Sequence, residues 1–306
     1  MNYRHIYHAG GFQDVAKHAA LALIVEALKK KDTPFYALDT HAGIGTYDLG
    51  SLEAGKTGEW RDGIGRVLAD PAPPAELAPY LAAVRAANPT QDVMPAKAGI
   101  QEANERMDSR LRGNDKGGES PIRWYPGSAR IIRTLMRKGD RLVACELHPE
   151  DAATLAEEFA RDRQVKVQAL DGWLAAKAFL PPKERRGLVL VDPPYEEPGE
   201  FARLATGLQE AHKRWATGIY LLWYPIKDRT ESDAFLAAVT ASGIRRVLLA
   251  ELAIAPLDAD RLTGSGLVIV NPPWGLDEAL RAMLPYLARV LGRGGASWRV
   301  ESLAGE

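Results

Sequence analysis

The sequence predicts an α/β protein in which helices cover both faces of a mostly parallel β-sheet. Short aliphatic runs alternate with stretches of helical periodicity, a pattern typical of this architecture. The runs are apolar along their length, as expected for strands buried on both faces. The seven predicted strands are Phe35–Asp39, Arg141–Glu146, Val165–Gln168, Leu188–Asp192, Ile219–Trp223, Arg245–Leu252 and Leu267–Asn271.

The connections between the strands predict two further features of the sheet. Helices are expected at Ala129–Arg137, Pro149–Arg161 and Phe201–Trp215, where apolar residues recur at helical spacing. Only Ala253–Gly266 separates the last two strands, which leaves no room for a full crossover helix. We therefore expect these two strands to pair as a terminal antiparallel element.

Residues 49–125 interrupt this alternation with helical fragments and no convincing strand, AELAPYLAAVRAAN being the best fragment. Within them, 94–118 is polar and glycine-rich, and it cannot bury enough apolar surface to order itself. The predicted organisation is an N-terminal segment 1–32, a sheet domain made of 33–48 and 126–306, and an inserted helical subdomain. Its loop 94–118 is expected to lie on the surface without a function.

The overall composition is that of an ordinary globular protein. The 306 residues carry a formal net charge of −1, which argues against coating nucleic acid through bulk charge but allows a local binding patch. Cys145 is the only cysteine, which excludes an internal disulfide and fits a reducing cytoplasm. No apolar run is long enough to span a bilayer, and no metal site is predicted. The longest helical candidate before the first strand is 19–28.

Acidic residues end four consecutive strand regions. Asp39, with the turn glycine Gly43 after it, is followed by Glu146, Asp171 and Asp192. Ligands of open parallel sheets bind outside the carboxyl ends of the strands, so the four acids should share one edge. The second acid suits two ribose hydroxyls, and the third suits an adenine amino group. Taken singly, each acid could instead cap a helix.

A formal match to a phosphate-binding loop occurs at residues 50–57, GSLEAGKT. With Asp192 as a magnesium-binding partner, this match would indicate a nucleoside triphosphatase. Such a loop works only between a buried strand and a helix N-terminus, whereas polar GTYDL precedes this one and glycine-rich GEWRDGIG follows it. We interpret residues 50–57 as an ordinary loop and keep the triphosphatase as a remote alternative.

An acid or amide, two prolines and an aromatic residue occur in series twice, at Asp192–Tyr195 and at Asn271–Trp274. The order of strands and acids resembles the Rossmann-like, seven-stranded methyltransferases that use S-adenosylmethionine. In that class, Asp-Pro-Pro-aromatic after the fourth strand is the signature of enzymes that methylate exocyclic amino nitrogens. The resemblance favours Asp192–Tyr195 as the catalytic tetrad. Asn271–Trp274 follows the seventh strand, and we expect it to end that strand and pack its tryptophan.

The first tetrad also has a chemical rationale. The lone pair of an exocyclic N6 amino group is delocalised into the purine ring, so the nitrogen is a weak nucleophile. The Asp192 carboxylate and the Pro193 backbone carbonyl could accept its two protons and aim the lone pair at a methyl donor. Tyr195 offers a flat face for an unstacked base.

The N-terminal segment interleaves cations with aromatic side chains, which suits looped or single-stranded RNA. The candidate RNA-binding residues are Tyr3, Arg4, His5 and Lys17. We interpret Lys29–Lys31 instead as solvated residues of an amphipathic helix.

Several motifs together resemble the RlmJ family of bacterial 23S ribosomal RNA adenine-N6 methyltransferases. They are YRHIYHAGGFQDVAKH, LDTHAG, WYPGS, ELHP, DG, LVDPPYE, WYP and NPPW, and they extend nearly end to end apart from 94–118. The resemblance implies S-adenosylmethionine as cofactor. It further implies methylation of one adenine in naked or partly assembled 23S rRNA, by a cytoplasmic monomer.

The resemblance and the motifs together assign the candidate site. The reaction centre would hold Asp192, Pro193 and Tyr195, and the cofactor would lie against His18, His41, Gly43, Ser128, Glu146, Asp171, Gly172 and Asp192. Ser128 also fits independently, because PGS opens a helix whose first amides could hold a carboxylate.

Three alternatives stay open besides the remote triphosphatase. A DNA adenine methyltransferase would use the same tetrad, but 49–125 holds no strongly basic recognition helix for the major groove. A protein glutamine methyltransferase would prefer asparagine where Asp192 stands. A non-catalytic nucleotide-binding protein would bind the cofactor and transfer nothing.

Overall fold

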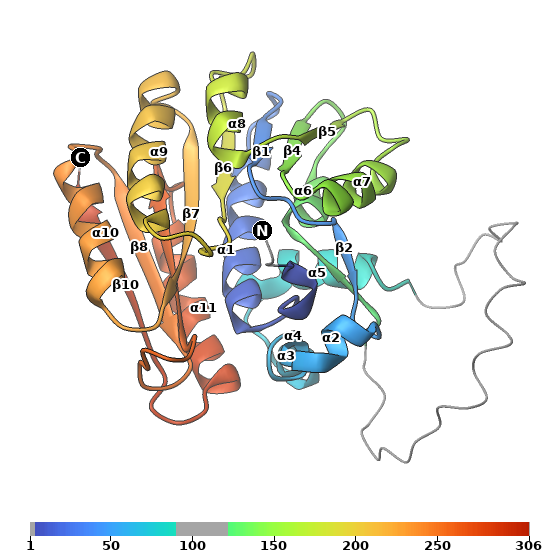
Figure 1. Ribbon diagram of the computed structural model, residues 1–306, viewed down its shortest axis with the longest axis vertical. Helices are drawn as coiled ribbons and strands as arrows, with labels where there is room; N and C mark the ends of the chain where they lie inside the picture. Colours follow the sequence, from blue (N-terminus) through green and yellow to red (C-terminus); the bar gives the residue numbers. More distant parts are fainter. Residues whose placement is uncertain (1–3, 90–121, 306) are drawn as a thin grey trace, which may run out of the picture.

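The computed structural model describes residues 4–89 and 122–305. An eight-stranded sheet in the order β10-β8-β9-β7-β6-β1-β4-β5 forms its centre (Figure 1). The strands are β1 Tyr36–Asp39, β4 Arg141–Glu146, β5 Val165–Ala169, β6 Gly187–Val191, β7 Ile219–Ile226, β8 Val247–Ala253, β9 Gly264–Val270 and β10 Ser297–Ala304. Strands β5, β4, β1, β6 and β7 are parallel, and β9 is antiparallel to both β7 and β8.

The predicted class of fold and the terminal antiparallel pair are confirmed, and the predicted number of strands is wrong by one. The missed strand, β10, pairs antiparallel with β8 at the edge of the sheet. Its sequence SWRVESLA exposes half of its residues, including Trp298 and Glu301. Edge strands of this kind lack the continuous aliphatic run by which the other strands were identified.

Two helical layers bury the two faces of the sheet. One layer consists of α8 Gly172–Phe179, α9 Glu200–Arg214 and α10 Thr230–Ala241, and the other includes α6 Ser128–Leu135, α7 Pro149–Glu158 and α11 Leu276–Leu291. Successive side chains of a strand point to opposite layers: Leu188 and Leu190 face the layer of α6 and α11, where the N-terminal helix Phe12–Lys29 lies against β6, and Val189 faces the layer of α8 and α9. Within 4–89 and 122–305, no helix has the length and apolar character that crossing a membrane requires.

The N-terminal helix α1, Phe12–Lys29, occupies the middle of the molecule (Figure 1). It begins seven residues before the predicted helical stretch 19–28, after a short 3₁₀ turn at His5–Tyr7. Small side chains such as Ala19 and Ala20 are fully buried and let α1 pack closely against α6 and α11. The N-terminal segment therefore carries polar residues into the interior of the protein.

The described part of 49–125 contains α2 Leu52–Thr57, α3 Glu59–Asp62, α4 Ile64–Ala69, η2 Ala75–Leu77 and α5 Ala78–Ala86. These elements share a core with α1, into which Trp60 and Tyr80 are buried. A strand was not expected in this region, but β3 Trp124–Pro126 pairs antiparallel with β2 Thr46–Asp48. The predicted loop 94–118 lies outside the described residues, and the division of the chain into domains stays a prediction.

Residues 50–57 form the start and body of helix α2, so the prediction of a loop is wrong. The Ser51 hydroxyl accepts a hydrogen bond from the Ala54 amide at 3.2 Å and caps the helix. Gly55 donates its amide to Ser51 within the same helix. The preceding strand β2 belongs to a two-stranded, partly exposed sheet. This arrangement lacks the converging free amides on which a triphosphatase would depend.

Candidate active site

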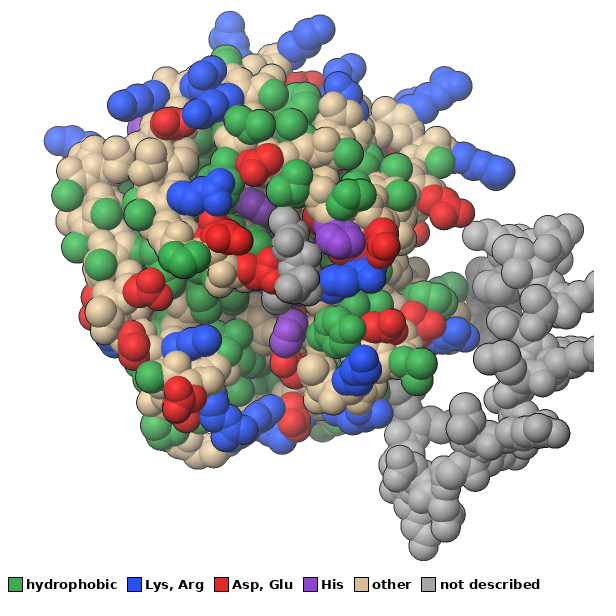
Figure 2. Space-filling view, viewed as in Figure 1, with side chains coloured by type: hydrophobic (Ala, Val, Ile, Leu, Met, Phe, Trp, Pro, Cys, Tyr) green, Lys and Arg blue, Asp and Glu red, His purple; other side chains and the backbone are tan. Residues whose placement is uncertain are grey.

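A cleft of about 420 Å³ lies at the carboxyl ends of β1, β4, β5 and β6. Glu146, Asp171 and Asp192 line it, and Asp39 lies beside it with no exposed surface. In Figure 2, acidic and histidine side chains gather in the middle of the face shown. The four acids therefore share one edge of the sheet, as the strand order predicts.

Gly43 and Glu146 connect the first two loops of the cleft. The Glu146 carboxylate accepts the Gly43 amide at 2.9 Å and the His148 amide at 2.8 Å. Burial raises the pKa of Glu146, and these amide hydrogen bonds oppose the rise. Gly43 has a φ of 60°, and a Cβ there would lie 2.1 Å from the Tyr47 hydroxyl. Only glycine fits this turn.

Asp171 and Gly172 hold the next loop against β1. One oxygen of Asp171, Oδ1, accepts the amides of Trp173 and Leu174 at 2.7 and 3.3 Å, so this acid does cap a helix, α8. Its second oxygen, Oδ2, makes no hydrogen bond to the residues that the structure describes. A Cβ on Gly172 would lie 2.5 Å from the Thr40 carbonyl and 2.6 Å from the His41 ring. The missing side chain thus lets His41 reach the cleft.

His41 is held in one tautomer by Thr40. The Thr40 hydroxyl donates to the Leu190 carbonyl at 2.9 Å, so it accepts from His41 Nδ1 at 2.8 Å. Burial lowers the pKa of His41 to about 4, against the opposing effect of the Asp192 charge. The neutral ring therefore carries its proton on Nδ1 and leaves Nε2 as an acceptor.

Asp39 and Ser128 form a buried pair beneath the cleft. The Ser128 hydroxyl donates to Asp39 Oδ2 at 2.6 Å, and the Asp39 Oδ1 atom accepts the His41 amide at 3.3 Å. Burial raises the pKa of Asp39 to about 7, although the Ser128 hydrogen bond opposes this. The Ser128 hydroxyl is thus committed to Asp39, and the amides of the first turn of α6 are what this helix offers to a ligand.

A chain of charged groups connects α1 to the first tetrad. Lys17, only 2% exposed, forms ion pairs with Asp192 Oδ2 and, at 2.9 Å, with Asp14 Oδ1. His5 Nε2 lies 2.8 Å from Asp14 Oδ2, which also accepts the Gly10 amide at 2.9 Å. Burial alone would raise the pKa of Asp14, but the nearby charges of His5 and Lys17 hold it well below its ordinary value. Lys17 therefore stays cationic and fixes one oxygen of Asp192.

Tyr195 closes the first tetrad in a fixed orientation. Its φ is 54°, and its hydroxyl donates to the Trp223 carbonyl at 2.9 Å. The Phe201 ring lies 4.8 Å from its ring, and the Trp223 ring lies 5.6 Å away. Pro193 and Tyr195 both line the cleft. Neighbouring aromatic side chains therefore set the plane of the tyrosine before any base arrives.

The second tetrad lies at the opposite edge of the sheet. Because β9 is antiparallel to β7, its end at Val270 lies beside the start of β7. Asn271 has a φ of 52° and donates to the Ala216 and Gly218 carbonyls, each at 2.8 Å. The prediction that this tetrad packs its tryptophan is wrong, since Trp274 is 91% exposed.

The four candidate RNA-binding residues have different surroundings. Tyr3 lies outside the described residues. Arg4 forms ion pairs with Asp151 at 2.7 Å and Glu150 at 3.3 Å, and it is not among the residues that line the cleft. His5 and Lys17 line the cleft, where both contact Asp14.

Asp14 and Tyr125 belong to the site but were not predicted. Asp14, Lys17 and His18 are three and four residues apart on α1, a spacing that puts them on one helix face and could have been read from the sequence. Tyr125 has no such signal: it reaches His18 Nδ1 at 2.8 Å only because β3 folds back over α1. Among the described residues, no three His, Cys, Asp or Glu side chains gather as a metal site requires.

The buried imidazole of His18 should make the protein sensitive to acid. Burial lowers the pKa of His18 to about 3, whereas it is about 6.5 in an unfolded chain. Between these values the unfolded state binds a proton that the folded state does not, so stability falls as pH falls. Between pH 6 and 4, the free energy of unfolding of the parent should fall with each pH unit by about 1.4 kcal/mol more than that of a His18→Gln variant. Urea denaturation at several pH values gives the free energy of unfolding of both proteins. The same dependence on pH in both would contradict this prediction.

Known proteins match the chain over nearly its whole length. A family model described as "Ribosomal RNA large subunit methyltransferase D, RlmJ" matches residues 32–116 and 98–304. "Ribosomal RNA large subunit methyltransferase J" of Escherichia coli K12 is 41% identical over 307 residues, 98% of this chain and 99% of that protein. The protein of the same name from Haemophilus influenzae is 39% identical over 309 residues, 100% of both chains.

A solved structure matches as well. The crystal structure of protein LPL1258 from Legionella pneumophila has a TM-score of 0.81 and 30% identity, and the match covers 96% of this chain and 98% of that one. Agreement in sequence and in fold over the full length leaves one assignment. The chain belongs to the RlmJ family of ribosomal RNA large subunit methyltransferases.

Proposed function

We propose that this protein transfers a methyl group from S-adenosylmethionine to the N6 amino group of one adenine in 23S ribosomal RNA. The observation that carries the proposal is the state of Asp192: Lys17 holds one carboxylate oxygen, and the carboxylate lines the cleft. The names of the two curated relatives support ribosomal RNA of the large subunit as the substrate. An acid followed by two prolines suits an exocyclic amine, because the carboxylate and the backbone carbonyl can accept its two protons.

The cleft offers complementary groups to each part of the cofactor. Glu146, whose oxygens each accept one amide, keeps further lone pairs for two ribose hydroxyls. Asp171 Oδ2 can accept from an adenine amino group, and the first amides of α6 after Gly127 suit a carboxylate. When bound, S-adenosylmethionine supplies an electrophilic methyl group on a positively charged sulfur. The residues present therefore fit this group.

The chain's own residues would position and orient the amine. The free oxygen of Asp192 and the Pro193 carbonyl accept the two amine protons, which turns the nitrogen lone pair away from the ring. Lys17 is a positioning residue: it fixes Asp192 Oδ2 and leaves Oδ1 for the substrate. Tyr195 stacks on the flipped base, with its ring already held by Phe201 and Trp223. Orientation and electrostatics supply the acceleration.

The finer parts of the proposal concern the working form of the protein. We place it in the cytoplasm as a monomer that acts on naked or partly assembled 23S rRNA. The state of the RNA follows from the need for a looped-out base, which requires RNA that ribosomal proteins have not yet covered.

Methyl transfer from tritiated S-adenosylmethionine tests the proposal. The acceptors are 23S rRNA from cells lacking the gene, 16S rRNA, genomic DNA and a protein extract. We expect label in 23S rRNA alone, with N6-methyladenosine after nuclease digestion, and mass mapping of the RNA then finds the nucleotide. Label in DNA would favour the DNA methyltransferase, and cofactor binding without transfer would favour a non-catalytic protein.

Gly172→Ala should weaken cofactor binding with little change in the substrate side of the cleft. A methyl group there would collide with the Thr40 carbonyl and push the His41 ring toward the cofactor. We expect the dissociation constant for S-adenosylmethionine, measured by calorimetry, to rise about tenfold or more. Gly55→Ala is a control, because nothing lies within 4 Å of a Cβ at that helical position. Unchanged affinity in Gly172→Ala would contradict the role given to this loop.

A further inference from the structure

The edge of the sheet opposite the cleft is rich in exposed cations. Strands β1, β4, β5, β6 and β7 start at this edge, β8 also starts there, and β9 ends there. Figure 2 shows Lys and Arg side chains along the upper edge, above the cleft. We call these exposed residues the basic edge: Lys30, Lys31, Lys138, Arg141, Arg161, Arg163, Lys183, Arg185, Lys213, Arg214, Arg245 and Arg246.

Little in the described structure neutralises the basic edge. Arg141 forms an ion pair with Glu184 at 3.7 Å, and the other members form no ion pair with a described residue. The helix dipole stabilises a cation in the last turn of a helix, which explains why Arg214 can stand unpaired at the end of α9. That effect does not reach Lys183 or Arg245, which stand in loops before β6 and β8. So many unpaired like charges are expected where a polyanion binds.

The cleft has the opposite charge. Its described lining includes seven carboxylates, those of Glu146, Asp151, Asp171, Asp192, Glu196, Glu197 and Glu200. The Lys and Arg residues that line it are three, Lys17, Arg203 and Lys227. Phosphate groups are repelled from such a rim, so the cleft can orient one nucleotide but contributes little affinity for the RNA backbone. Affinity for a long RNA has to come from another surface.

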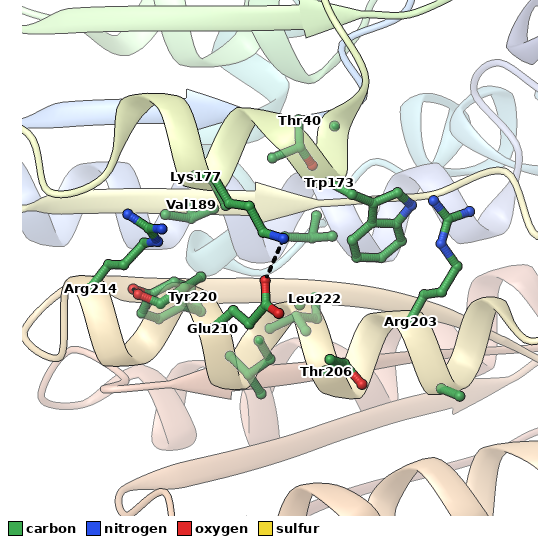
Figure 3. A pocket seen from close by; sticks show the side chains of 17 residues that line it. Thr40, Trp173, Lys177, Val189, Arg203, Thr206, Glu210, Arg214, Tyr220 and Leu222 are labelled. Carbon is green, nitrogen blue, oxygen red and sulfur yellow. Dashed lines mark hydrogen bonds and ion pairs between the residues drawn. The ribbon is translucent and has the colours of Figure 1, made fainter.

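A groove between α8 and α9 joins the cleft to the basic edge. This second cavity, of about 330 Å³, shares Trp173 and Arg203 with the cleft and extends to Arg214 (Figure 3). Arg214 follows Arg203 by eleven positions on α9, which is about 16 Å along the helix. At the cleft end, Arg203 lies 5.2 Å from the Trp173 ring, and midway Lys177 pairs with Glu210 at 3.1 Å. The groove thus combines an aromatic ring with spaced cations, as surfaces for single-stranded RNA do.

We propose that the basic edge is a second RNA-binding surface, which holds phosphates of 23S rRNA remote from the target adenine, and that the α8–α9 groove guides the strand between it and the cleft. This inference rests on the proposed function for the identity of the RNA. It separates two tasks: the cleft selects and orients one base, and the basic edge supplies salt-dependent affinity for the surrounding RNA. A short RNA that reaches only the cleft does not use the basic edge.

A matched pair of charge-reversal variants tests this proposal. The edge variant is Lys213→Glu with Arg245→Glu, and the control is Arg61→Glu with Arg85→Glu. All four positions are exposed, and both variants change the net charge equally. Binding of each full-length protein to deproteinised 23S rRNA is measured from 50 to 200 mM salt, together with methylation of 23S rRNA and of the shortest transcript that the parent still methylates.

We expect the edge variant to bind 23S rRNA about tenfold or more weakly, with a slope of log K against log salt that is smaller by about 1 to 2. Its methylation of the short transcript should match that of the parent, as should all results for the control. Equal affinity of the edge and control variants for 23S rRNA would overturn the proposal, and so would an equal loss on both RNAs. RNA binding is measured without catalysis, so a protein that methylates another acceptor would still give a result here.

Discussion

Asp192→Ala should abolish methyl transfer while the protein stays folded and still binds its cofactor. The variant removes the acceptor that holds the amine, and with it the orientation on which the reaction depends, so we expect a loss of about a thousandfold in kcat. The fold should survive because Lys17 keeps its second partner, Asp14, at 2.9 Å. Tritiated methyl transfer, thermal unfolding and calorimetric titration with S-adenosylmethionine give the three readouts.

Two further variants make this result specific. Asp192→Asn keeps an acceptor oxygen and should retain a measurable part of the activity. Asn271→Ala alters the second tetrad, which lies at the opposite edge of the sheet, and should leave the activity of folded protein unchanged. An active Asp192→Ala protein would refute the catalytic assignment and return attention to Asn271.

Lys17→Ala should reduce both stability and RNA methylation. Lys17 is buried between two carboxylates, and its removal leaves the Oδ1 atom of Asp14, a residue with no exposed surface, without its cation. Breaking a buried ion pair from one side costs about 3 to 5 kcal/mol, so we expect a loss of free energy of unfolding near the lower value. Asp192 also loses the group that fixes Oδ2, and kcat should fall more than cofactor affinity does.

A double variant separates the structural effect of Lys17 from its positioning effect. Lys17→Met with Asp14→Asn removes both buried charges and should recover much of the stability in urea denaturation. It cannot restore the contact to Asp192, so methylation should stay low. If the double variant recovers activity together with stability, Lys17 has only a structural role. An equal loss of cofactor affinity and methylation in Lys17→Ala would also contradict positioning.

The sequence by itself determined the strands of the sheet that are buried on both faces, and the edge at which the site lies. Aliphatic runs identified the central strands because burial on both faces leaves few polar positions, whereas β5, at the edge of the sheet, has no buried residue. Parallel strands end at one edge, so Glu146 and Asp192 had to lie together. Strand β10 was not predicted because polar residues, half-exposed at the edge of the sheet, interrupt its aliphatic pattern. Helix α2 was not predicted because a formal match to a phosphate loop does not specify local structure.

Only the tertiary structure determined which side chains of the site contact one another and where charged residues gather on the surface. Asp14 becomes a site residue because α1 packs in the middle of the molecule, where its carboxylate must find a cation. The second tetrad, which the sequence already disfavoured, lies at the edge away from the cleft because β9 is antiparallel to β7. The basic edge is likewise invisible in a net charge of −1, because its members, such as Lys183 and Arg245, come from loops far apart in the chain. Packing partners and charge segregation depend on which distant segments meet, and local sequence patterns do not specify that.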